Sequence, residues 1–172
     1  MKKIILSLLL IVAAANVPTM AQKFALVDME YILKNIPAYE RANEQLSQTS
    51  KKWQAEVEAI NLQAQTLYKN YQNEVVFLSA EQKKAREDEI LKKEKEASDL
   101  KKKYFAPEGE LFKKRESLVG PIQDEIYNAV KAIAEQKGYQ LILDRASDNG
   151  IVFASPTADI SNDVLAKLGY SK

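Results

Sequence analysis

The hydrophobic pattern is most regular between residues 38 and 106, where the chain carries neither Gly nor Pro. Small or apolar side chains recur there every three or four positions, at Tyr39, Ala42, Leu46, Thr49, Trp53, Val57, Ile60, Ala64, Leu67, Tyr71, Val75 and Leu78. This spacing is typical of one face of a long amphipathic helix and differs from the alternation of a strand. Pro37 suits the first turn of such a helix, because its missing N–H needs no partner there.

A break inside this run predicts two helices that run in opposite directions. Residues 75–78 are apolar on all sides, and Ser79 followed by Gln82 forms the pattern of a capping box that begins a new helix. We therefore expect an antiparallel helical hairpin with its tip near residues 73–79. The return helix is more charged, and its apolar seam is thin, with only Ile90, Ala97, Leu100 and Tyr104.

Two Gly/Pro pairs predict kinks in the return path, the first at Pro107 and Gly109 and the second at Gly120 and Pro121. Beyond them the helical stripe resumes and ends at Gly138. It consists of Ile122, Ile126, Ala129, Val130 and Ile133.

Short apolar runs at both ends predict strands. Residues 24–27 form the first, followed by Asp28 as the cap of a short helix, and residues 139–143 and 151–154 form the second and third. A last helix is expected from Asn162 to Leu168, stopped by Gly169. The sequence thus predicts a mostly helical α+β fold, in which a coiled-coil-like hairpin (the arm, residues 37–121) projects from a small β-containing body (residues 22–36 and 122–172).

The predicted body is too small to stabilise such a long hairpin alone, and the edges of its sheet would be open to pairing. Association of several copies through the body removes both difficulties. A monomer whose arm folds back on the sheet is the alternative. The candidate core of the oligomer consists of Phe24, Leu26, Leu141, Leu143, Ile151 and Phe153.

The first 21 residues predict a secretory signal peptide. Lys2 and Lys3 precede an apolar run of about a dozen residues, which is shorter than the ~20 that a membrane span requires. Small residues at Thr19 and Ala21 suit cleavage after Ala21. We therefore expect an exported protein that is not integral to a membrane.

Composition excludes several classes of site. The 172 residues include no His and no Cys, so imidazole and thiolate chemistry is absent, and we expect no enzyme activity, metal or cofactor. A Ser–Lys dyad or paired carboxylates stay chemically open, but no pocket is predicted around them. The 25 basic and 24 acidic residues are interleaved, which argues against nucleic-acid binding.

Four segments together carry a family resemblance: Phe24 to Asp28, Gly138 to Asp144, Gly150 to Phe153, and Asp159 to Leu165. With the signal peptide and the charged hairpin, their order resembles the Skp/OmpH family of periplasmic chaperones. The resemblance implies a periplasmic homotrimer whose arms enclose a cavity for unfolded outer-membrane proteins, its clients, held without ATP. Contact with lipid or lipopolysaccharide stays open, because the basic residues of that site do not map onto this chain.

Side chains off the main seam are candidates for contact with clients: Tyr68, Val76, Phe77, Phe105 and Phe112. Packing within the hairpin is the alternative for the aromatic residues. A different function also stays open, that of an exported spacer or adaptor that docks a partner protein through the hairpin tip.

Overall fold

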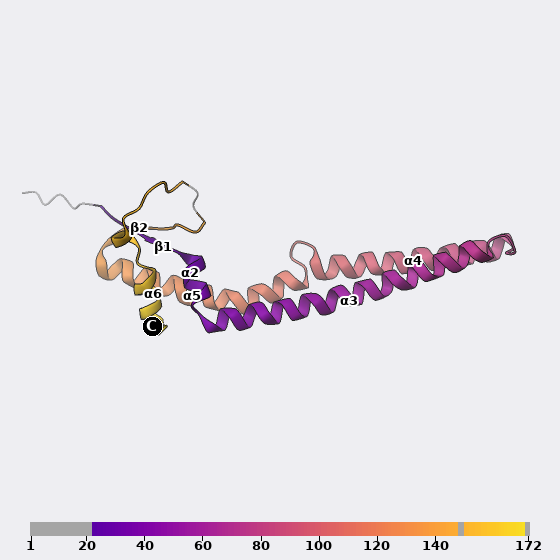
Figure 1. The fold of residues 1–172 in the computed structure, drawn as a ribbon, viewed down its shortest axis with the longest axis horizontal. Helices are drawn as coiled ribbons and strands as arrows, with labels where there is room; N and C mark the ends of the chain where they lie inside the picture. The colour runs from indigo at the N-terminus through magenta and orange to yellow at the C-terminus, as the bar shows by residue number, and fades with distance from the viewer. Residues whose placement is uncertain (1–21, 148–149, 171–172) are drawn as a thin grey trace, which may run out of the picture.

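The fold is described by a computed structural model for residues 22–147 and 150–170 (Figure 1). The predicted signal peptide and its cleavage site lie outside these residues. The elements in chain order are β1 (Lys23–Val27), α2 (Met29–Lys34), α3 (Pro37–Glu74), α4 (Ala80–Phe105), α5 (Glu110–Lys137), β2 (Tyr139–Asp144), the 3-10 turn η1 (Pro156–Ala158) and α6 (Ser161–Lys167). The described chain is therefore mostly helical with a small sheet, which confirms the predicted mostly helical α+β fold class.

Helix α3 is the longest element, and α4 followed by α5 packs along it in the opposite direction (Figure 1). Every residue of the predicted stripe on α3 is buried or half-buried, and Ala42, Val57 and Ala64 are the buried ones. The thin seam of α4 contributes Ile90 and Ala97 to the same interface. The helical periodicity thus predicted the contact face of both helices.

Residues 75–79 reverse the chain between α3 and α4. The backbone N–H of Gln82 donates to Ser79 Oγ at 3.3 Å, and the backbone N–H of Ser79 donates to Gln82 Oε1 at 2.9 Å. These two bonds confirm the capping box that the sequence predicts.

A tight corner joins α4 to α5. Glu108 has a positive φ of 64°, and a Cβ on Gly109 would lie 2.9 Å from the carbonyl oxygen of Ala106. At the second expected kink, by contrast, α5 continues through Gly120 and Pro121. Glycine before proline has no Cβ to clash with the proline ring, so the helical conformation is retained there.

Strands β1 and β2 form a two-stranded parallel sheet, in which Phe24 pairs with Leu141 and Val27 with Asp144. The third strand predicted at residues 151–154 is wrong, because the described chain has no regular structure there. The outer edge of β1 is instead occupied by the segment after η1. The N–H of Ile160 donates to the carbonyl oxygen of Leu26 at 2.9 Å, beside an isolated bridge to Asp159.

The hydrophobic core lies where the two chain ends meet. Side chains of β1, α2, α5 and α6 pack together there, and Ile32, Ile126 and Val164 are the most completely buried. The stripe predicted on α5 supplies much of this core, since Ile122, Ile126, Ala129 and Ile133 are all buried, whereas Val130 is half-buried.

Polar contacts join the same segments at the carboxyl ends of the strands. The N–H of Asp28, the predicted helix cap, donates to Ser161 Oγ at 2.8 Å, and its carboxylate accepts from Tyr31 N–H. The N–H of Met29 donates to Asp144 Oδ1 at 3.1 Å. Residues near position 28, position 144 and position 160 are therefore fixed to one another although they are far apart in sequence.

A second set of contacts centres on Asp159. Its Oδ1 accepts from both the N–H and the Oγ–H of Ser161, and its Oδ2 accepts from Arg145 at 3.1 Å. Burial alone would raise the pKa of the Asp159 carboxyl, but the Ser161 and Arg145 contacts outweigh it and hold the pKa below the ordinary value. The carboxylate is thus part of the structure that holds α6 against the sheet.

Candidate functional site

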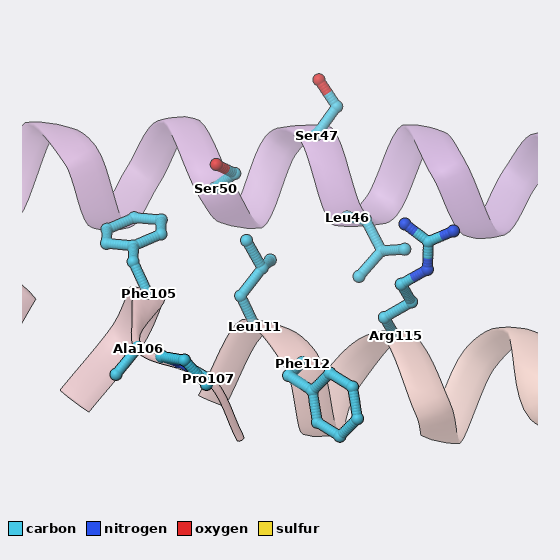
Figure 2. Close-up of a pocket in the computed structure, with 9 residues that line it drawn as sticks. All are labelled: Leu46, Ser47, Ser50, Phe105, Ala106, Pro107, Leu111, Phe112 and Arg115. Carbon is cyan, nitrogen blue, oxygen red and sulfur yellow. The ribbon is translucent and has the colours of Figure 1, made fainter. Parts of the chain in front are cut away.

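An apolar groove of about 510 Å³ lies at the corner between α4 and α5, facing α3 (Figure 2). Leu46 from α3 and Leu111 and Arg115 from α5 extend into the space between the helices (Figure 2). The full lining consists of Leu46, Ser47, Ser50, Phe105, Ala106, Pro107, Leu111, Phe112 and Arg115. A groove of this size and composition is suited to an apolar side chain.

An aromatic cluster holds Phe105 at one end of the groove. The ring of Phe105 meets that of Tyr104 edge to face, with 6.2 Å between the centroids. Tyr104 in turn stacks on Trp53 of α3, and its hydroxyl donates to Glu56 Oε2 at 2.7 Å. This hydrogen bond raises the pKa of the Tyr104 hydroxyl, and burial acts in the same direction. The contacts fix the last turn of α4 against α3.

The structure brings together two of the five candidate contact residues. Phe105 and Phe112 line the same groove, and Phe112 is 48% exposed. Val76 and Phe77 form a second group in the tip, where they are 76% and 85% exposed. Tyr68, on α3, belongs to neither group and is half exposed. Exposed apolar surface therefore occurs at both the corner and the tip.

Sequence reasoning did not anticipate Leu46, Leu111 and Arg115 as members of one site. Leu46 was expected only as part of the contact face of α3. For Leu111 and Arg115, no motif or periodicity in the sequence indicated a role in binding. Pro107 and Gly109 were the available clue, because a break at that point places residues on either side of it next to each other. The partner across the groove depends on the offset between α3 and α5, which periodicity does not provide.

The candidate oligomer residues lie on β1, on β2 and in the segment after β2. Phe24 and Leu141 are partners in the register and remain 54% and 47% exposed, so the sheet presents apolar side chains to solvent at this pair in the single chain. Phe153 is also exposed, whereas Leu143 and Ile151 are half-buried. Leu26 is already buried within the chain.

Within residues 22–147 and 150–170, no three side chains of His, Cys, Asp or Glu gather in a way that would hold a metal ion. No helix in the same ranges combines the length and the apolar character that crossing a membrane requires. What the described chain presents is exposed apolar surface at the corner, at the tip and on the sheet.

Comparison with known proteins supplies a family likeness that covers the arm and the body. The family model described as outer membrane protein (OmpH-like) matches residues 23–168. The chaperone protein Skp of Yersinia enterocolitica is 27% identical over 157 residues, which cover 90% of this chain and 91% of the relative. The chaperone protein Skp of Pectobacterium atrosepticum is 25% identical over 161 residues, covering 92% and 93%.

A solved structure from Caulobacter crescentus CB15, described as an OmpH-like outer membrane chaperone, has a similar fold. It superimposes with a TM-score of 0.66 at 11% sequence identity and covers 86% of this chain and 84% of its own. At that identity the likeness concerns the fold alone. The family likeness therefore comes from the sequence comparisons, and the solved structure shares the fold.

Proposed function

Because this chain belongs to the OmpH-like family of outer membrane proteins, we propose that it is a periplasmic holdase chaperone, exported by a signal peptide that is cleaved after Ala21. It binds unfolded outer-membrane proteins without ATP and keeps them from aggregating. The observation that carries the proposal is the exposed apolar side chains on a long arm that extends away from the body (Figure 1). No enzymatic step is part of this function.

Physical chemistry supports holding by distributed contacts. Unfolded membrane β-barrel chains expose apolar side chains at alternate positions and aggregate through their strands. Separate apolar patches at the corner and the tip offer such chains weak contacts at several points. The many Lys and Arg residues of α4 add attraction for acidic segments.

Trimerisation through the body is part of the proposal. Phe24 and Leu141, which pair in the sheet, are each about half exposed, and Val152 and Phe153 in the segment after β2 are 100% and 85% exposed. Apolar area of this kind favours association with equivalent surfaces of other copies. Three arms would then surround a common cavity.

Aggregation assays test the holding activity directly. A urea-denatured outer-membrane β-barrel protein is diluted into buffer with or without excess purified protein, in the absence of ATP, and light scattering is followed. We expect scattering to be suppressed in proportion to the protein added. Unchanged aggregation at a severalfold excess of trimer would refute the holdase proposal.

Native mass measured by light scattering tests the assembly. The wild-type protein should have three times the mass of one chain. Leu141→Glu should lower this mass, while Leu91→Glu, an equally drastic change of an exposed leucine on α4, should leave it unchanged. A wild-type monomer would contradict the proposed cavity.

The tip supports a second candidate function, docking of one partner protein by a spacer or adaptor. Val76 and Phe77 are the observation in its favour, because both are strongly exposed at the far end of the arm. Capture of a single partner in fixed stoichiometry, lost in Phe77→Glu, would favour this function. Retention of aggregation suppression in Phe77→Glu would show that the tip is not needed for holding.

A further inference from the structure

The groove at the α4–α5 corner combines apolar walls with one guanidinium group. We propose that it is a subsite for an apolar side chain of an extended polypeptide, and that Arg115 binds a carboxylate two residues away in the same segment. The groove would thereby select the pattern apolar–any–acidic within a client. This inference rests on the proposed function, since it takes an unfolded client as the occupant.

The apolar half of the subsite is already formed in the free chain. Leu46, Phe105 and Leu111 come from three helices whose positions are fixed by packing along α3. The corner itself is closed tightly, since the N–H of Gly109 donates to the carbonyl oxygen of Ala106 at 2.8 Å. A preformed groove binds at a lower cost in conformational entropy than one that must order on binding.

The charged half of the subsite is Arg115. Arg86 pairs with Glu74 and Glu89, and Arg145 pairs with Asp28 and Asp159. Arg115, in contrast, forms no ion pair with any residue in the described part of the chain. Its guanidinium is therefore available to a carboxylate, which it can bind through two parallel hydrogen bonds.

The surrounding sequence strengthens the preference for acidic segments. Residues 101–115 contain six basic and two acidic side chains, so this part of the chain is locally positive although the whole protein is nearly neutral. Attraction of that kind raises the rate at which acidic chains meet the site.

The spacing of the proposed pattern follows from geometry. Leu111 and Arg115 are four residues apart on α5, which corresponds to about 6 Å along a helix. In an extended chain, side chains two residues apart point to the same side and are separated by about 6.7 Å. An apolar residue placed over Leu111 therefore brings the side chain two positions away over Arg115.

Fluorescence anisotropy with labelled eleven-residue peptides tests this selection on the full chain. The peptides share a Gly/Ser background and carry Phe-Ser-Asp, Phe-Ser-Lys, Phe-Asp-Ser or Ser-Ser-Asp at the centre. We expect Phe-Ser-Asp to bind about fivefold more tightly than each of the other three. Equal affinities for Phe-Ser-Asp and Phe-Ser-Lys would overturn the proposal.

Charge variants separate the groove from general attraction. Arg115→Gln should abolish the preference for Phe-Ser-Asp over Phe-Ser-Lys. Lys69→Gln, which removes the same charge from an exposed position on α3 far along the arm, should retain it. An equal loss in both variants would mean that only overall charge matters. Circular dichroism of each variant establishes that it is folded.

A single introduced thiol locates the bound peptide, because the chain contains no Cys. Ser50→Cys, labelled with an environment-sensitive dye, should change its emission when Phe-Ser-Asp is added. A change on concentrating the protein alone, or only with anionic lipid vesicles, would identify a second copy or a lipid as the occupant and overturn the proposal. No change with peptide would also overturn it.

The aggregation assay distinguishes failure of the subsite from failure of the function. Suppression of aggregation by the wild-type protein, together with unselective peptide binding, would refute the subsite and leave the holdase proposal in place. Selective peptide binding without suppression would support the recognition pattern and refute the holdase proposal.

Discussion

The ring of Trp53 in α3 stacks on the ring of Tyr104 in α4, with 4.5 Å between the centroids and 4° between the planes. The same tyrosine hydroxyl donates to Glu56, one helical turn from Trp53. One residue near the end of α4 is thus held to α3 by both an aromatic and a polar contact. Because Tyr104 directly precedes Phe105, which lines the groove, these contacts fix the end of α4 at the edge of the groove.

Replacement of Trp53 by alanine should lower the free energy of unfolding by about 2 kcal/mol. The change removes a half-buried ring and its stacking contact, and the value is below that of a fully buried aromatic residue for this reason. Chemical denaturation followed by far-UV circular dichroism measures the loss. Trp53→Phe, which can still stack, should lose much less, and equal losses in both variants would contradict the role of stacking.

Removal of the cap at the tip should destabilise the start of α4. Ser79→Ala leaves the N–H of Gln82 without its acceptor, and we expect a cost of about 1 kcal/mol. Ser79→Asp retains an acceptor and should stay within a few tenths of the wild-type value. Hydrogen exchange of the amides in residues 80–84 reports the local effect, and unchanged protection in Ser79→Ala would contradict it.

The corner should be sensitive to a single methyl group. A Cβ on Gly109 would lie 2.9 to 3.0 Å from the carbonyl oxygens of Ala106, Lys103 and Tyr104, which are backbone atoms that cannot move independently. Gly109→Ala should therefore displace the end of α4, weaken the Trp53–Tyr104 stack and shift the emission of the only tryptophan in the chain.

Glu108→Gly is the matched variant at the same corner. It removes a non-glycine residue from a positive φ of 64° and should raise stability by up to about 1 kcal/mol, with no change in tryptophan emission. An emission shift in Glu108→Gly as large as that in Gly109→Ala would show that the carbonyl contacts do not control the corner.

Local pattern predicted the helices well because their contact faces repeat with the helical period. Every residue of the stripe from Tyr39 to Leu78 is buried or half-buried, and Ser79 caps α4 as expected. In these cases the residues that determine the structure are close together in sequence, so the helix face and the helix start can be predicted from neighbouring positions alone.

Contacts between distant segments were harder to predict. Residues 151–154 have a strand-like composition, but Asp159 and Ile160 occupy the edge of β1, and the partner of a strand is not encoded in its own residues. The groove depends likewise on which turn of α3 lies opposite the α4–α5 corner. Leu46 and Arg115 share a site only because of that offset.

Stability should decrease in acid because of Asp144 and Asp159. Burial would raise the pKa of both carboxyls, but hydrogen bonds outweigh it and lower each pKa below the ordinary 3.8. Asp159 accepts hydrogen bonds from Ser161 and Arg145. Asp144 accepts them from Met29, Ala146 and Ser147. A carboxyl with a lower pKa in the folded state stabilises the fold above its unfolded pKa, and this contribution is lost as the pH falls through the folded pKa.

Thermal unfolding measured between pH 7 and pH 3 tests this dependence. The melting temperature should be steady from pH 7 to about pH 5 and fall below it, since the unfolded carboxyls then begin to bind protons. Asp159→Asn should be less stable than the wild type at pH 7, and the difference should narrow as the pH falls, because the Asp159 carboxyl then binds a proton and loses its charge. Asp88→Asn, an exposed change on α4, should follow the wild-type curve throughout. A gap between Asp159→Asn and the wild type that is the same at pH 3 as at pH 7 would show that the charge of Asp159 does not hold α6 against the sheet.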